Sequence, residues 1–259
     1  MPNPPALPRG GFTLPINGFD MYCEVGGDGP LLVFLPGALV GVDVHRHLVE
    51  AFRKRFTVLT GDAKGQGRST LGRGPITYVS MTSDVIRLLD HFGIGEADFF
   101  GIGDGGVCGF HLLVDYSHRV RSVSMSGAPY SHAAYTQFGR DFIDRIGGRM
   151  LAPTGYLKVF RDSYAMTSPN PAQFDEVARR VAKTWGSQPN FNKAMLATIE
   201  KPALVISCDR DEFISEAAFR RVAAWIPKAR LAHFPGMGHL PAMFRDALVA
   251  KVADFVASI

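Results

Sequence analysis

The sequence predicts an α/β fold, with a mostly parallel central sheet, helices on both of its faces and a helical insertion. Two observations lead to this prediction. Short apolar runs typical of strands alternate with segments of helical spacing up to about residue 128, and the alternation resumes after residue 200. Residues 129–200 are mostly helical in pattern and show no clear strand. We therefore expect a core formed by residues 1–128 and 201–259, and a helical cap formed by residues 129–200.

The first half of the chain contains five candidate strands. Each is a short apolar or alternating run, which is the pattern of a strand in a sheet. The strands are FDMYCEV (19–25), LLVFLPG (31–37), FTVLT (56–60), ADFFG (97–101) and VRSVSMSG (120–127). The helices predicted between them are VHRHLVEAFRKR (44–55), MTSDVIRLLDHFG (81–93) and GGVCGFHLLVDY (105–116).

The last part of the chain repeats this alternation. It contains the strands ALVISCD (203–209) and ARLAHFPG (229–236), a helix near 216–226 and a final helix over 243–257. The insertion before it is rich in large apolar residues, most of which we expect in the cap's own core. If about a third of them face a cavity, its ligand is a mainly apolar or aromatic small molecule. These residues are Tyr130, Tyr135, Phe138, Phe142, Tyr156, Phe160, Tyr164, Met166, Trp185, Phe191 and Met195.

The composition argues against several classes of protein. The 28 Lys and Arg residues are scattered, so no nucleic-acid surface is expected. No run approaches the roughly 18 apolar residues of a membrane span, and the proline-rich start lacks the apolar core of a signal peptide. Cys23, Cys108 and Cys208 are far apart and not at metal-ligand spacings, which favours a reducing, cytoplasmic location. We expect a small-molecule substrate as the partner, with no nucleic acid and no membrane; a homodimer stays open.

Three segments that could carry chemistry follow predicted strands. Open α/β sheets place their sites at the carboxyl ends of the strands, so these segments are expected to meet. GIGDGG (101–106) is a strand-to-helix turn whose tip, Gly103, has no side chain. CDRDEF (208–213) offers acids, and PGMGHLPAMF (235–244) offers a histidine.

With two further segments, this pattern resembles the α/β-hydrolase superfamily over nearly the whole chain. FLPG (34–37) resembles the family's oxyanion loop, with Pro36 where many members have His. GDAKGQGRS (61–69) resembles its D-x-R-G-x-G-x-S loop, and GIGDGG resembles a nucleophile elbow reading G-x-S-D-G-G. The resemblance implies the family's fold, with Gly103 in the place of the nucleophilic serine.

The resemblance also implies a role for each residue of the site. His239 would be the general base, and Asp211 would orient it, with Asp209 and Glu212 as rival acids. Asp211 ranks first because it matches the last Asp of the family's G-D-x-D turn. The backbone N–H groups of Ala38 and Asp104 would form the oxyanion hole. No metal or organic cofactor is implied.

Asp104 is a second candidate nucleophile, because dehalogenases and epoxide hydrolases of this fold use an aspartate. Their aspartate occupies the tip of the turn, whereas Asp104 lies one position later and would put Ile102 where a small residue is needed. Gly103 therefore remains the expected tip. Asp104 would then be a favourable charge in the first helical turn or a contact for a cationic group of the substrate.

The implied parent activity is the hydrolysis of an ester, a lactone or a similar acyl bond by a serine-type enzyme that is inactivated in this chain. A natural ligand-binding protein without catalysis and chemistry by His239 without a serine remain open, as do cleavage of amides and of carbon–carbon bonds in ring-fission products. The residues expected to contact the substrate are Leu39, Asp104, His132, Phe138, Trp185 and Leu240.

Other residues that could suggest a site are assigned structural roles. His45 and His47 are two apart on a predicted helix, so they face different directions and are expected on the surface rather than as a metal pair. The loop 61–69 lacks the G-K-[ST] ending of a phosphate-binding loop. Cys108 is expected in the core.

Overall fold

A computed structural model describes residues 7–148 and 155–259. An eight-stranded sheet lies at its centre, in the order β1-β2-β4-β3-β5-β6-β7-β8. Every pairing from β4 to β8 is parallel. At one edge, β1 pairs antiparallel with β2, and β2 pairs antiparallel with β4. The predicted α/β class with a mostly parallel sheet is confirmed.

The elements follow the predicted alternation. The strands are β1 (Gly10–Ile16), β2 (Phe19–Gly26), β3 (Leu31–Leu35), β4 (Thr57–Gly61), β5 (Ala97–Ile102), β6 (Val120–Ser126), β7 (Ala203–Arg210) and β8 (Ala229–Gly238). The helices are α1 (Arg46–Arg53), α2 (Tyr78–His91), α3 (Asp104–Asp115), α4 (Gln137–Gly147), α5 (Tyr156–Thr167), α6 (Phe174–Ser187), α7 (Lys193–Leu196), α8 (Glu216–Trp225) and α9 (Arg245–Ala257). Short 3₁₀ turns are η1 (Val42–His45), η2 (Ser117–Arg119), η3 (His132–Ala134), η4 (Pro171–Gln173) and η5 (Ala242–Phe244).

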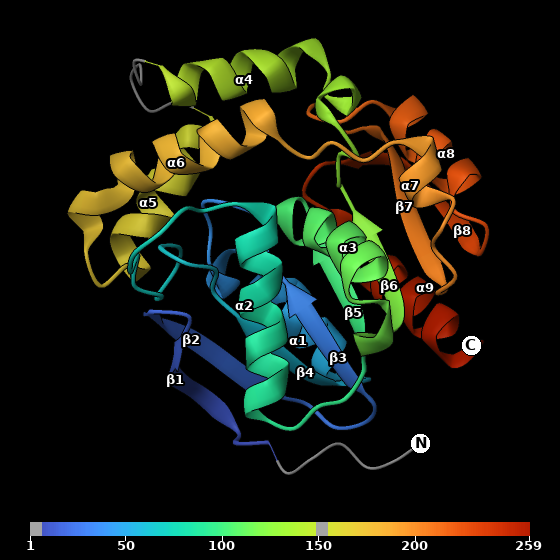
Figure 1. The fold of residues 1–259 in the computed structure, drawn as a ribbon, viewed down its shortest axis with the longest axis horizontal. Helices are drawn as coiled ribbons and strands as arrows, with labels where there is room; N and C mark the ends of the chain where they lie inside the picture. The colour runs from blue at the N-terminus through green and yellow to red at the C-terminus, as the bar shows by residue number, and fades with distance from the viewer. Residues whose placement is uncertain (1–6, 149–154) are drawn as a thin grey trace.

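Helices cover both faces of the sheet, and the core lies between them. The pair α2 and α3 packs on one face, and the pair α1 and α9 packs on the other (Figure 1). Every residue of β5 is buried, as expected for a central parallel strand. Phe34, Phe52 and Phe100 pack their rings together in this core, with the closest centroids 4.9 Å apart. The packed core therefore fixes the ends of the strands from which the loops at the carboxyl edge extend.

The helices between β6 and β7 lie beyond the carboxyl ends of the parallel strands (Figure 1). Two side chains of α6 bond to the core: Thr184 donates to the carbonyl of Ile76, and Arg180 donates to the carbonyl of Gly74 at 3.1 Å. The division into a core and a cap over 129–200 stays a prediction. Residues 1–6 of the predicted core and residues 149–154 of the predicted cap lie outside the described residues.

Two elements differ from the sequence-based expectation. The edge strand β1 is not among the strands predicted from the sequence. It pairs with β2 along its whole length. Helix α2 begins at Tyr78 rather than at residue 81, because Thr77 and Ser80 bond to each other's backbone N–H groups and cap the helix earlier. Within the described ranges, every helix is too short or too polar to cross a membrane.

Candidate functional site

The turn between β5 and α3 places Gly103 at the carboxyl edge of the sheet. Gly103 has φ +54° and ψ −121°, a conformation that costs a residue with a Cβ atom about 1–3 kcal/mol. The glycines beside it are required by close packing. A Cβ atom at position 105 would lie 2.0 Å from the carbonyl oxygen of Leu35, and one at position 101 would lie 2.3 Å from the carbonyl oxygen of Gly105. The glycine-rich sequence therefore lets helix α3 start directly against the sheet.

Replacing Gly105 by alanine is expected to destabilise the fold by about 1–3 kcal/mol or more, because the new methyl group collides with rigid backbone. Gly95→Ala is the matched control, since a Cβ atom there meets nothing within 4 Å. Urea unfolding at equilibrium measures both effects. Equal midpoints for the two variants would show that the close approach at Gly105 is not a constraint.

Asp211 and His239 meet beside this turn. Asp211 follows β7 and His239 follows β8, and the imidazole Nδ1 lies 3.1 and 3.0 Å from the two carboxylate oxygens of Asp211. The backbone N–H groups of Phe213 and Ile214 each donate to Oδ1 of Asp211 at 2.9 Å. Gly127, after β6, leaves room for the ring, because a Cβ atom there would lie 2.8 Å from Cε1 of His239. The carboxylate thus fixes the imidazole with Nε2 turned toward Gly103.

Each member of this pair stabilises the charge of the other. Burial raises the pKa of Asp211, but the facing imidazole and the two backbone N–H groups outweigh it and hold that pKa below its ordinary value. Burial lowers the pKa of His239, but the carboxylate of Asp211 outweighs it, so the pKa of His239 is raised. The pair therefore suits a base that must hold a proton for part of a reaction.

The two rival acids bond elsewhere. The exposed Asp209 accepts from the backbone N–H of Gly236 at 2.6 Å. Glu212 accepts from the hydroxyl of Tyr156 on α5 and from the backbone N–H of His239 at 3.3 Å. Of the three acids in this turn, Asp211 alone bonds to the imidazole.

The loop after β3 is held by side chains on both sides of Ala38. The N–H of Gly37 donates to Nε2 of His45 at 3.4 Å, and the N–H of Leu39 donates to Oε1 of Gln66. The N–H of Ala38, between them, has no acceptor in the described part of the chain, and neither does the N–H of Asp104. Two backbone donors are therefore available beside Gly103, as an oxyanion hole requires.

His45 was expected on the surface, and that prediction was wrong. It is buried and lines the cavity. Burial lowers its pKa to about 3, so the ring is neutral and its Nε2 can accept the N–H of Gly37. The signal was present in the sequence: His45 stands three, four and seven residues before Leu48, Val49 and Phe52, all of which are buried. Gln66 gave no comparable signal.

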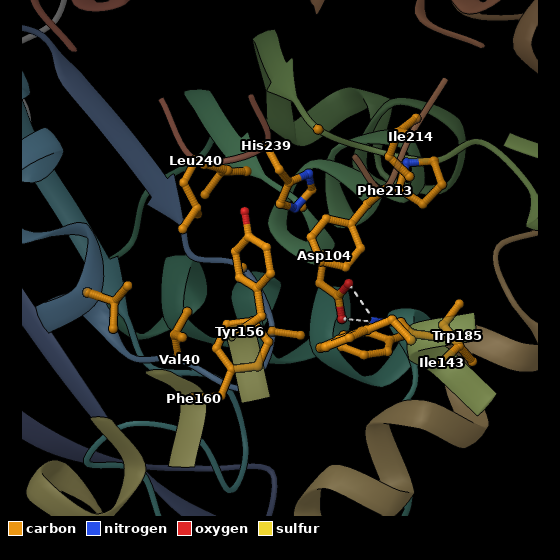
Figure 2. Close-up of a pocket in the computed structure, with 18 of the residues that line it drawn as sticks. Val40, Asp104, Ile143, Tyr156, Phe160, Trp185, Phe213, Ile214, His239 and Leu240 are labelled. Atoms are coloured by element: carbon orange, nitrogen blue, oxygen red, sulfur yellow. Dashed lines mark hydrogen bonds between the residues drawn. The ribbon is translucent and has the colours of Figure 1, made fainter. Parts of the chain in front are cut away.

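A cavity of about 700 Å³, counting its open mouth, lies between the turn and the cap helices. Gly103, Asp104 and His239 line its floor, and Figure 2 shows His239, Asp104, Trp185 and Tyr156 around the same space. Its walls are mainly apolar, and they include six aromatic side chains: Tyr135, Phe142, Tyr156, Phe160, Trp185 and Phe213.

Of the residues predicted to contact the substrate, Asp104, Trp185 and Leu240 line this cavity. Leu39 does not, because its side chain is fully buried in the core. His132 is exposed, and Phe138 is half exposed, with its ring stacked beside that of Phe142. Neither of these two lines the cavity.

Asp104 joins the turn to helix α6. The indole N–H of Trp185 on α6 donates to both of its carboxylate oxygens, at 2.8 and 3.0 Å (Figure 2). The hydroxyl of Tyr78 on α2 donates to Oδ1 at 3.1 Å. Burial raises the pKa of Asp104 to about 6, although both hydrogen bonds oppose the rise. The side chain is thus neither a free helix-start charge nor an unpartnered site for a cation.

Asp104→Asn is expected to make stability less dependent on pH. A carboxyl group whose pKa rises on folding from 3.8 to about 6 stabilises the fold below 3.8 and loses that contribution as the pH rises through 6. The asparagine cannot ionise. The free energy of unfolding of the variant, relative to that of the unaltered protein, should therefore increase by about 1–2 kcal/mol between pH 5 and pH 8. Urea unfolding of both proteins at the two pH values measures this. Parallel changes in the two proteins would contradict it.

Comparisons with known proteins identify the family and the fold of this chain. Residues 32–252 match the model of the alpha/beta hydrolase family. The proposed carbamate hydrolase RutD of Azorhizobium caulinodans is 27% identical over 251 residues, which cover 89% of this chain and 94% of that protein. The 3-oxoadipate enol-lactonase 2 of Acinetobacter baylyi is 27% identical over 144 residues, 55% of this chain and 54% of that protein.

The fold also matches solved structures. The enol-lactonase from Burkholderia xenovorans gives a TM-score of 0.73 at 22% identity, with 95% of this chain and 100% of that chain covered. At that identity the match shows the fold alone. Among the described residues, no group of three or more His, Cys, Asp or Glu side chains could hold a metal ion. Because the family match spans most of the sequence, this chain belongs to the alpha/beta hydrolase family.

Proposed function

We propose that the chain is a serine-type hydrolase of ester, lactone or similar acyl bonds in which Gly103 replaces the nucleophile and strongly impairs the activity. One observation carries this proposal. A Cβ atom at position 103 would lie 3.6 Å from Nε2 of His239 and 3.7 Å from Cα of Gly37, with nothing closer. A serine hydroxyl would therefore fit there and reach the imidazole.

The rest of the site would perform the serine chemistry in an order set by its geometry. His239 would take the proton of the serine hydroxyl as its oxygen attacks the carbonyl carbon, and Asp211 would stabilise the resulting imidazolium. The N–H groups of Ala38 and Asp104 would bind the oxyanion. When the tetrahedral intermediate collapses, the bond to the leaving group would break, and His239 would give its proton to that group, leaving an acyl-enzyme. Water activated by His239 would then attack the acyl-enzyme and release the acid and the serine. The aromatic cavity supports a mainly apolar or aromatic substrate, and the names of the relatives, a carbamate hydrolase and an enol-lactonase, fit acyl chemistry.

Covalent labelling tests this proposal. Gly103→Ser should react with a fluorophosphonate probe at residue 103, and the adduct should be found there by peptide mass spectrometry. The unaltered chain should not react at that position, and Gly103→Ser combined with His239→Gln should react far more slowly. A correctly folded Gly103→Ser that resists the probe would refute the assignment of position 103 as the nucleophile's place.

A natural ligand-binding protein is the second candidate. The apolar cavity favours it, since an apolar site without a nucleophile can hold a substrate-like molecule unchanged. The two candidates differ in one outcome. If the chain is only a binding protein whose remaining site cannot support catalysis, restoring a serine does not produce turnover of esters, lactones, amides or ring-fission products.

A further inference from the structure

We propose that His239 activates a water molecule in the space beside Gly103, so that this chain itself hydrolyses acyl bonds in a single displacement, without a covalent intermediate. The inference rests on the proposed function for the class of substrate. It goes beyond that function because it assigns an activity to the glycine-bearing chain rather than to a serine variant.

The space beside Gly103 is part of the cavity and has room for a small molecule such as water. Apart from Gly103 and its two chain neighbours, the heavy atom nearest to the position of an absent Cβ is Nε2 of His239, at 3.6 Å. An oxygen atom placed slightly nearer the imidazole would be within hydrogen-bond distance of Nε2. A buried water needs polar partners as well as room, and Nε2 of His239 is one such partner. Ala38 and Asp104, whose N–H groups are free, line the same cavity, and these two donors are left for the carbonyl oxygen of the substrate.

The hydrogen bonds and charges around His239 favour its action as a base at this position. Its Nδ1 is taken by Asp211, while its Nε2 has no partner among the described residues. The carboxylate accepts a hydrogen bond from the N–H of Nδ1. Nε2 then carries the lone pair that can accept a proton from water. The acids near the ring, Asp211, Glu212 and Asp104, all favour its protonated form, which strengthens the base.

The proposed reaction balances without any other reactant. The water oxygen forms a bond to the carbonyl carbon while one of its protons passes to Nε2 of His239. The carbonyl oxygen becomes an oxyanion and is held by the N–H groups of Ala38 and Asp104. When the tetrahedral intermediate collapses, the bond to the leaving oxygen breaks and His239 returns the proton to that oxygen. One ester and one water give one acid and one alcohol.

The absence of a Cβ atom is essential to this inference. A methyl group at position 103 would occupy the water's space and leave Nε2 facing carbon. Gly103→Ala thus removes the water site, and it carries the same backbone strain as Gly103→Ser. The two variants are therefore matched controls for each other.

The experiment compares hydrolysis of 4-nitrophenyl acetate by four proteins of identical preparation: the unaltered chain, Gly103→Ala, Gly103→Ser and His239→Gln. The unaltered chain should show slow turnover without an initial burst. Gly103→Ala and His239→Gln should each lower that rate about a hundredfold, or to the background, because one displaces the water and the other removes the base. Gly103→Ser should show a burst of nitrophenol as an acyl-enzyme forms.

Methanol provides an independent readout, since it can occupy the same space and attack in place of water. With the unaltered chain, added methanol should yield methyl acetate, and the yield should fall to the background in His239→Gln. This comparison keeps the inference testable if Gly103→Ala fails to fold.

The outcomes separate this inference from the proposed function. If the unaltered chain is no faster than His239→Gln and forms no methyl acetate, while Gly103→Ser is active, the water mechanism is wrong and the proposed function stands. If folded Gly103→Ser is also inactive, both are wrong. A turnover by the unaltered chain that depends on His239 and is lost in Gly103→Ala supports the inference.

Discussion

Gly103→Ser is expected to raise the hydrolysis of a short-chain nitrophenyl ester by about 10³–10⁶-fold over the unaltered chain. Loss of the nucleophile from a serine-hydrolase triad costs a factor of this order, while the oxyanion hole and binding retain the remainder. The other parts of the site are already in place: Nε2 of His239 lies 3.6 Å from the Cβ position, and two backbone N–H groups are free. Steady-state kinetics on both proteins measures the gain.

The gain should come with a small loss of stability. Serine at φ +54° is strained, and the strain costs about 1–3 kcal/mol in urea unfolding. Gly103→Ala should be destabilised to a similar extent and gain no activity, so strain and chemistry can be separated. An active alanine variant would mean that the hydroxyl is not the source of the gain.

Asp211→Asn in the Gly103→Ser background is expected to lower kcat by about 10⁴-fold. Oδ1 of Asp211 accepts the N–H groups of Phe213 and Ile214, so the asparagine must turn its amide oxygen toward them. Its NH₂ group then faces Nδ1 of His239, which has to become the acceptor. The ring proton moves to Nε2, and the base can no longer accept a proton from the serine.

Asp209→Asn in the same background is the control, because it changes an exposed acid of the same turn whose bond to the N–H of Gly236 an amide oxygen can keep. We expect its kcat to change little. Comparable losses in the two variants would indicate that the charge of this turn, rather than the orientation of His239, matters for catalysis.

Local patterns in the sequence were sufficient to predict seven of the eight strands of the sheet and the three segments at its carboxyl edge. The apolar runs at 31–37, 97–101 and 203–209 each correspond to a buried strand, and Gly103 and Asp211 follow two of them. His239 follows β8, which is largely exposed. Because parallel strands end at one edge, their order along the chain was enough to bring these residues together.

The contacts between the cap and the turn could not be predicted in the same way. The hydrogen bond from Trp185 to Asp104 joins residues 81 positions apart, and it depends on where α6 lies relative to the first residue of α3. The bond from Tyr156 to Glu212 depends likewise on α5. The burial of His45 could have been predicted from its spacing to Leu48 and Phe52. The different direction of His47 argues against a metal pair, but it does not indicate that His45 is exposed.

The most direct measurement is a crystal structure of Gly103→Ser after reaction with a fluorophosphonate. We predict phosphorus bonded to the serine oxygen, with one phosphoryl oxygen about 2.7–3.1 Å from the backbone nitrogens of Ala38 and Asp104. Nε2 of His239 should lie within hydrogen-bond distance of the serine oxygen, with Asp211 still bonded to Nδ1. A phosphoryl oxygen directed away from both nitrogens, or an imidazole turned from residue 103, would contradict the convergence of these groups on that position.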